Sequence, residues 1–181
     1  IDFCCIIISF IKKKMTMQKI QKELKNLANP EKAKILQRFF KTGKGEYGEG
    51  DIFLGIMVPQ QRKIAKKYED LALKGIQELL NSKIHEQRLV ALFILVDKYK
   101  KADVKEKKKI FDFYLKNTKN INNWDLIDLS APNIVGGYLL DKKRDILYKL
   151  AKSKSLWERR ISIMATAIFI KNNQFKYTLK L

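Results

Sequence analysis

From Gln18 onward, the apolar residues of this 181-residue chain recur with the period of an α-helix. Ile20, Leu24 and Leu27 follow the spacing i, i+4, i+7, which places them on one helix face. No segment of the sequence alternates between apolar and polar residues over more than a few positions, as a half-buried strand does. This pattern predicts an all-α protein.

Capping residues mark the starts of several candidate helices. Asp103, Asn122 and Ser155 are each followed three residues later by an acidic residue, which complements the first turn of a helix. First helices of successive pairs are expected near Asp103 and Asp141, and second helices near Ser82, Asn122 and Ser155. Helical pairs that recur every ~35–45 residues are typical of HEAT or armadillo repeats, which stack into an α-α superhelix. The expected helices cover residues 59–68, 70–81, 84–100, 104–118, 123–137, 141–152 and 156–171.

Residues 41–51 form a conspicuous loop, because four of these eleven residues are glycine and cannot sustain a helix. The Gly43-Lys44 pair lacks the spacing of a phosphate-binding P-loop, and no strand precedes it. We interpret this segment as a hinge or a backbone-contact loop.

The cysteine and histidine content argues against a disulfide framework and against a zinc site. Cys4 and Cys5 are adjacent, and His85 is the only histidine of the sequence. The chain is therefore expected to bind no metal and no cofactor, and to be cytoplasmic, because its cysteine usage suits a reducing compartment.

The first eleven residues are nearly all apolar and precede Lys12-Lys13-Lys14. Eleven residues are too few to span a bilayer, which needs ~20, and a secretory signal carries its positive charge before the apolar run. We expect residues 1–14 to be upstream sequence and the native start to be Met15 or Met17. Residues 1–16 are then a non-native or disordered extension of a domain at 17–181. A short interfacial anchor is the alternative.

The charge of +19 would attract polyanions, namely nucleic acid or an anionic membrane surface. Of the 38 basic residues, 32 are lysine and only six are arginine. Lysine has A/T-rich codons, so a biased genome explains part of this excess. The charge is therefore a reason to look for a binding site, and the site itself must carry the functional conclusion.

Three clusters of polar and aromatic residues lie at the starts of expected second helices. In residues 122–128, Trp124 and Asp128 are four positions apart and share one helix face if Asn122 is the cap. The alternative is that Trp124 fills a gap between repeats and Asp128 is solvated. Residues 85–88 (His-Glu-Gln-Arg) form a second cluster, which we interpret as a cap at a repeat interface.

The third cluster is Leu156-Trp157-Glu158-Arg159-Arg160. Trp157 and Arg160 are three positions apart and share a helix face. Arginine is favoured over lysine where two parallel hydrogen bonds to a phosphate are needed, so Arg159 and Arg160 are a functional hint in a lysine-rich chain. The alternative is that one of these arginines pairs with a nearby carboxylate.

Four segments together resemble the AlkD-like DNA alkylation repair family. Phe53-Leu54-Gly55-Ile56, with Pro59 and Arg62, resembles the N-terminal signature of the family, and residues 42–48 resemble the loop before it. Residues 124–128 (Trp-Asp-Leu-Ile-Asp) resemble the W-D-x-x-D motif, and Trp157-x-x-Arg160 resembles the W-x-x-R motif. The order and the spacing of these segments agree over about residues 18–180.

The resemblance implies a monomeric HEAT-like-repeat DNA glycosylase, which removes cationic N3- or N7-alkylated purines from double-stranded DNA without flipping the base. It implies that Asp128 is the catalytic carboxylate, that Trp124 packs against the deoxyribose and that Arg160 holds the phosphate backbone. Some family members have tyrosine at the position of Phe39. The further expected DNA-binding residues are Phe39, Trp157, Arg159, Lys44 and Lys154.

The family continues with further helices past the position of Leu181, so we expect the C-terminal repeats to be missing from this chain. No membrane partner is expected. Two other functions stay open at this point: a non-catalytic DNA-binding module of the same ancestry, and a protein-interaction solenoid whose lysine content is compositional.

Overall fold

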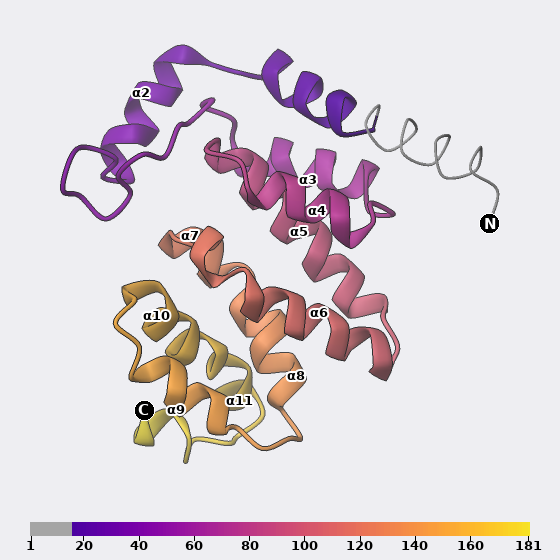
Figure 1. Ribbon diagram of the computed structural model, residues 1–181, viewed down its shortest axis with the longest axis vertical. Helices are drawn as coiled ribbons and strands as arrows, with labels where there is room; N and C mark the ends of the chain where they lie inside the picture. Colours follow the sequence, from indigo (N-terminus) through magenta and orange to yellow (C-terminus); the bar gives the residue numbers. More distant parts are fainter. Residues whose placement is uncertain (1–15) are drawn as a thin grey trace. The chain divides into compact units, whose positions relative to one another are not determined.

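The computed structural model describes residues 16–181, which are built of α-helices as the sequence predicts (Figure 1). Within this described part, no strand is formed, and the only extended pairing is an isolated bridge between Ile52 and Ile84. None of the described helices is both long and apolar enough to cross a membrane. Except for Thr16, the expected extension at residues 1–16 lies outside the described residues, as do Cys4 and Cys5.

The chain divides into two compact units, Ile1–Ile94 and Leu95–Leu181. The described part of the first unit begins with a helix over residues 16–26, whose Ile20 and Leu24 are fully buried. Leu27 follows the end of this helix and is 37% exposed, so the predicted apolar face is one residue shorter than expected. The helices that follow are α2 (Pro30–Phe39), α3 (Val58–Lys67), α4 (Leu73–Leu80) and α5 (His85–Lys101), the last of which contains the boundary of the units.

The second unit contains the candidate catalytic residues. Its elements are α6 (Val104–Lys116), η1 (Thr118–Asn120), α7 (Trp124–Asp128), η2 (Pro132–Gly136), α8 (Gly137–Leu139), α9 (Asp145–Ala151), α10 (Leu156–Ala165), α11 (Ala167–Lys171) and η3 (Thr178–Lys180). Helix α10 packs against α9, α7 and η2, and α6 packs against η2 and α8 (Figure 1). The buried side chains of Ile134, Leu147, Ile161 and Phe169 form part of the core of this unit. Helix α10, which packs against both α7 and α9, is therefore central to the site.

The expected continuous helix at 123–137 is wrong, because the structure interrupts it directly after Asp128. Leu129 and Ser130 form a turn, and η2 is a turn of π-helix. In an α-helix the carbonyl of Asp128 would accept a hydrogen bond from the N–H of residue 132, but Pro132 has no N–H. The hydroxyl of Ser130 also donates to the carbonyl of Leu126 at 2.5 Å, which supports the local bend.

The helix starts are confirmed at Asp103 and Ser155, whose side chains accept hydrogen bonds from the N–H groups of the third residue of α6 and of α10. The expected cap Asn122 is wrong by one position, because Asn123 is the residue that caps α7 and bonds the N–H of Trp124. The expected start near Asp141 is wrong as well, since α9 begins at Asp145.

Arg144 directly precedes α9, which begins late. Its guanidinium lies over the rings of both Phe169 and Tyr177, at 3.9 and 4.1 Å from their centroids, and its Nε donates to the carbonyl of Leu139 at 3.1 Å. The backbone at Arg144 has φ −113° and ψ 18°, outside the regular helical values. The contacts of this buried arginine accompany the late start of α9, and helical periodicity does not reveal them.

Candidate functional site

Helices α7 and α10 carry the two motifs with tryptophan, and they pack against each other within the second unit. Each helix begins at a capping residue that is one or two positions before its tryptophan, Trp124 in α7 and Trp157 in α10. Both indole side chains are only partly exposed. The caps fix where each helix begins, and therefore which residues of the two motifs meet.

Asp128 and Arg160 form an ion pair with two parallel hydrogen bonds. The Nε of Arg160 donates to Oδ1 of Asp128 at 2.8 Å, and its Nη2 donates to Oδ2 at 2.7 Å. The side chains are 26% and 38% exposed, so solvent still reaches the pair. The alternative of a merely solvated Asp128 is therefore wrong in this structure, whereas the alternative that an arginine pairs with a carboxylate is observed, with Asp128 as the partner.

A buried network lies behind α7. The hydroxyl of Tyr114, on α6, is 2.8 Å from the Oγ of Ser130, which in turn donates to the carbonyl of Leu126. Tyr114 is fully buried, and burial and the negative charge of Asp128 raise its pKa, although the bond to Ser130 acts in the opposite direction. The sequence interpretation missed Tyr114 and Ser130; a serine two residues before a proline at a helix break is the signal that could have found them.

Glu158, on the first turn of α10, is a third residue that the sequence interpretation did not assign to the site. Its carboxylate accepts hydrogen bonds from the hydroxyls of Thr118 at 2.8 Å and Ser153 at 2.5 Å. Arg159, expected to bind DNA, uses its Nη1 for the carbonyls of Ser153 and Lys154, at 2.8 and 3.0 Å. The side chains of Arg159 and Lys154 are exposed.

The remaining expected DNA-binding residues, Phe39 and Lys44, lie in the first unit. Phe39 ends α2 and is 60% exposed, with its ring edge-on to the buried Phe40. Lys44 is exposed in the glycine-rich loop. The N–H groups of Gly43 and Gly45 bond the carboxylates of Glu46 and Glu49, each at 2.8 Å. These amides are therefore engaged by the loop itself, which fits the interpretation that this is not a P-loop.

The segment that resembles the N-terminal family signature is held by the buried Glu86. The carboxylate of Glu86 accepts hydrogen bonds from the backbone N–H groups of Leu54, Gly55 and Ile56, the shortest at 2.8 Å. Gly55 has φ 82°, and a Cβ at this position would lie 2.2 Å from the carbonyl oxygen of Asn29. This part of the signature is thus a close backbone packing between the loop and α2.

His85 and Arg88 complete a buried polar cluster around Asp51. Nη2 of Arg88 donates to Oδ2 of Asp51 at 2.6 Å, and Nδ1 of His85 lies 3.2 Å from the same oxygen. Burial raises the pKa of Asp51, but the hydrogen bond of His85 and the charge of Arg88 outweigh this effect and hold it below its ordinary value. The contacts support the interpretation of residues 85–88 as a structural cluster.

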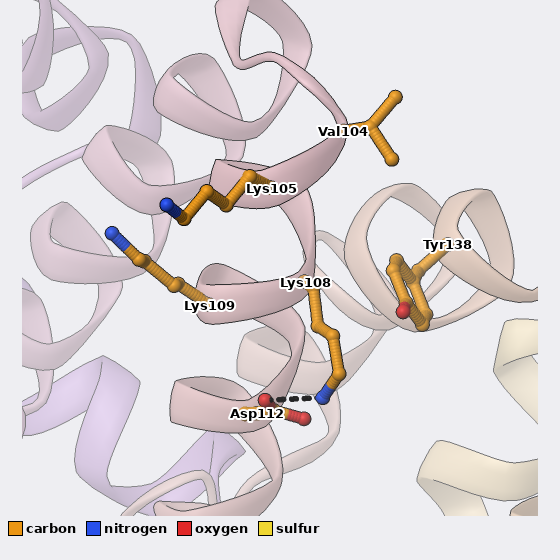
Figure 2. Close-up of a pocket in the computed structure, with 6 residues that line it drawn as sticks. All are labelled: Val104, Lys105, Lys108, Lys109, Asp112 and Tyr138. Carbon is orange, nitrogen blue, oxygen red and sulfur yellow. Dashed lines mark hydrogen bonds and ion pairs between the residues drawn. The ribbon is translucent and has the colours of Figure 1, made fainter.

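A cavity of about 420 Å³ lies beside α6, away from the residues of the ion pair (Figure 2). It is lined by Val104, Lys105, Lys108, Lys109, Asp112 and Tyr138. Figure 2 shows Lys108 directed to Asp112, with which it forms an ion pair at 2.7 Å, while Lys105 and Lys109 extend away from Tyr138. The cavity holds none of the expected site residues, so the candidate site is the partly exposed ion pair of α7 and α10.

Fold and site together define a strongly basic, all-α protein with one carboxylate held by an arginine between two tryptophan-bearing helices. A family model described as DNA alkylation repair enzyme matches residues 20–181. The chain therefore belongs to the DNA alkylation repair enzyme family, which makes DNA repair its role and DNA its substrate. Among the curated proteins, no match to this chain is found.

Proposed function

We propose that the protein is a DNA glycosylase, which hydrolyses the N-glycosidic bond of cationic N3- or N7-alkylated purines in double-stranded DNA. The observation that carries the proposal is the pairing of Asp128 with Arg160, because it joins the acidic residue of one motif to the basic residue of the other. Membership of the DNA alkylation repair enzyme family supports this chemistry.

The proposed reaction needs little from the enzyme. An alkylated purine of this kind already carries a positive charge, so when the bond from C1′ to the base nitrogen breaks, the bonding electrons neutralise the departing base. No general acid is required. A water molecule adds at C1′ and loses a proton, which leaves an abasic deoxyribose. The enzyme must stabilise the positive charge that develops on the sugar and orient this water.

Asp128 supplies the negative charge in this proposal. Its carboxylate stabilises the sugar cation and accepts a hydrogen bond from the attacking water, while Trp124, one helical turn earlier on α7, packs against the deoxyribose. The reaction proceeds with the base still stacked in the duplex, so no pocket for a flipped base is required.

Arg160 has two partners in the proposed cycle. In the free protein its guanidinium holds both oxygens of Asp128. A DNA phosphate competes for the same planar group, since arginine binds carboxylate and phosphate with similar geometry. We propose that, when DNA binds, a backbone phosphate replaces Asp128 as the partner of Arg160. The released carboxylate of Asp128 then turns toward the sugar.

The high positive charge supports affinity for DNA rather than chemistry. A chain with a formal charge of +19 gains affinity through release of counterions from the phosphates, so its binding weakens steeply as the salt concentration rises. Phe39, Lys44, Lys154, Trp157 and Arg159 are the residues that we propose to contact the strand besides the catalytic group. The protein is proposed to act as a cytoplasmic monomer.

The test uses the full chain, duplex DNA treated with a methylating agent, and the variant Asp128→Asn. The native protein should release 7-methylguanine or 3-methyladenine, and the variant should lose release by about a hundredfold or more, the scale of removing one electrostatic group from a transition state. Its affinity for DNA should be kept or rise slightly, because the negative charge that the variant removes opposes phosphate binding.

Two outcomes of the same experiment favour the alternatives. Salt-sensitive binding to DNA without base release by the native chain would indicate a non-catalytic DNA-binding module. Binding that is weak and insensitive to salt would indicate a protein-interaction solenoid. Normal release by Asp128→Asn would show that the assigned chemistry is wrong.

A further inference from the structure

Glu158 is the third residue of α10, and its side chain does not make the contact that its position favours. After a serine cap, a glutamate at the third position ordinarily bonds the backbone N–H of the cap residue. Here the N–H of Ser155 instead donates to the hydroxyl of Ser153 at 3.1 Å. The carboxylate of Glu158 turns away from the cap and accepts the hydroxyls of Thr118 and Ser153.

These bonds join three segments of the second unit. Thr118 begins η1, the short helical turn that leads into α7, and it is 40 residues before Glu158. Ser153 belongs to the connection between α9 and α10, and Glu158 itself lies on the first turn of α10. The carboxylate therefore ties the start of α10 to the segment that precedes α7.

Glu158, which accepts these two hydrogen bonds, is next to the residues of the candidate site in the sequence. Trp157 directly precedes Glu158, and Arg160, which holds Asp128, follows two positions later. A shift of the first turn of α10 relative to η1 would therefore move the guanidinium of Arg160 relative to the carboxylate of Asp128. Misplacement of a reacting group by about 1 Å can cost about a hundredfold in rate.

We propose that Glu158 is a positioning residue that fastens the first turn of α10 to η1, so that Arg160 and Trp157 are held in register with Asp128. This role rests on the proposed glycosylase function for its effect on catalysis. Both partners of the carboxylate are neutral hydroxyls, so the role is geometric: Glu158 acts through its acceptor oxygens, and its negative charge is not required.

The chain provides a matched control for this proposal. Glu106 is the third residue of α6 and follows the cap Asp103, as Glu158 follows Ser155. Within the described residues its side chain makes no hydrogen bond to another segment. Glu106→Ala thus removes the same favourable charge from a helix N-terminus as Glu158→Ala, but leaves the tie to η1 intact.

Excision of methylated purines should separate the two variants. In single-turnover measurements, Glu158→Ala should lower the rate of base release at least about tenfold, with an affinity for DNA within about threefold of the native value. Glu106→Ala should stay within about twofold. Glu158→Gln, whose amide oxygen can still accept the hydroxyl of Thr118, should recover most of the rate.

Tryptophan fluorescence provides a readout that does not depend on catalysis. The sequence contains two tryptophans, so a Trp124→Phe background leaves Trp157 as the single emitter. In this background Glu158→Ala should shift the emission of Trp157 to the red and increase its quenching by acrylamide, whereas Glu106→Ala should not. Thr118→Val removes one hydrogen-bond donor to Glu158 without changing the sequence of α10, and it should shift the emission in the same direction. This variant replaces Glu158→Ala in the test if Glu158→Ala does not fold.

The two proposals can fail separately. An unchanged emission of Trp157 in both Glu158→Ala and Thr118→Val, or an equal loss of excision in Glu106→Ala, would overturn the positioning role of Glu158. If the native protein releases no base, the proposed function fails, and the emission of Trp157 still decides whether Glu158 positions α10.

Discussion

The guanidinium of Arg160 holds both carboxylate oxygens of Asp128, although the two residues are 32 positions apart in the sequence. Their pairing brings the end of α7 against the first half of α10, at a place where both side chains remain partly exposed. The acidic group and the basic group that the two motifs supply therefore form a single ion pair in the structure.

Replacement of Arg160 by lysine should separate the effect of the positive charge from the effect of the two parallel hydrogen bonds. A lysine ammonium keeps the charge but cannot make two parallel hydrogen bonds to one carboxylate or one phosphate. We expect Arg160→Lys to lower base release by about tenfold to a hundredfold, since a hydrogen bond to a charged group contributes about 1.5–3 kcal/mol. Arg38→Lys is the control, because Arg38 is exposed near the end of α2 and belongs to neither motif, and it should change release by less than about threefold.

Removal of the hydroxyl of Tyr114 should destabilise the second unit. Tyr114→Phe leaves the buried Ser130 without this partner, and we expect the free energy of unfolding to fall by about 1–2 kcal/mol in urea titrations. Tyr148 is partly exposed, and its hydroxyl makes no hydrogen bond within residues 16–181. Tyr148→Phe should therefore stay within about 0.5 kcal/mol of the native value. Equal losses in the two variants would argue against a role for the Tyr114 bond.

Two glycines with nearly the same backbone conformation should respond differently to alanine. Gly45 and Gly55 have φ values of 78° and 82°, so alanine is strained at either position. At Gly45 nothing lies within 4 Å of an added Cβ, whereas at Gly55 the carbonyl oxygen of Asn29 lies at 2.2 Å. Gly45→Ala should cost about 1 kcal/mol and Gly55→Ala clearly more, because backbone must also move. Thermal unfolding of both variants measures this difference.

Stability should fall in acid because of Asp51. Its pKa is lower in the folded protein than its ordinary value of 3.8, so the folded state binds fewer protons than the unfolded chain as the pH falls. Its contribution is fully present above the unfolded pKa, about pH 4, and is lost as the pH falls through the folded pKa.

Asp51→Asn should remove this acid-dependent part of the unfolding free energy. At neutral pH it should cost about 3–5 kcal/mol, because it leaves the buried Arg88 without its counter-charge. Asp112, paired with Lys108 on the surface, offers the comparison, and Asp112→Asn should cost less than about 1 kcal/mol. An Asp51→Asn protein that keeps the native dependence of stability on pH below about pH 4 would contradict this assignment.

Local patterns were sufficient for most helices and for the identity of the motif residues. The apolar period of 3.6 and the caps Asp103 and Ser155 place α6 and α10, because both signals act between residues within one or two turns. The same period places Trp124 and Asp128 on one face of α7. The end of α7 depends on Ser130 and on the missing N–H of Pro132, so the pattern alone extended this helix too far.

The sequence by itself determined the helical class, the charge and the residues that could meet at a site. Only the tertiary structure decided that Arg160 pairs with Asp128 and that Glu86 binds the backbone of Leu54–Ile56. It also decided that Glu158 accepts a hydrogen bond from Thr118 and not from its own cap residue. Each of these contacts joins side chains or backbone 30 or more residues apart. Periodicity and capping are set by near neighbours, whereas such pairings depend on how the helices pack, and packing is a property of the whole unit.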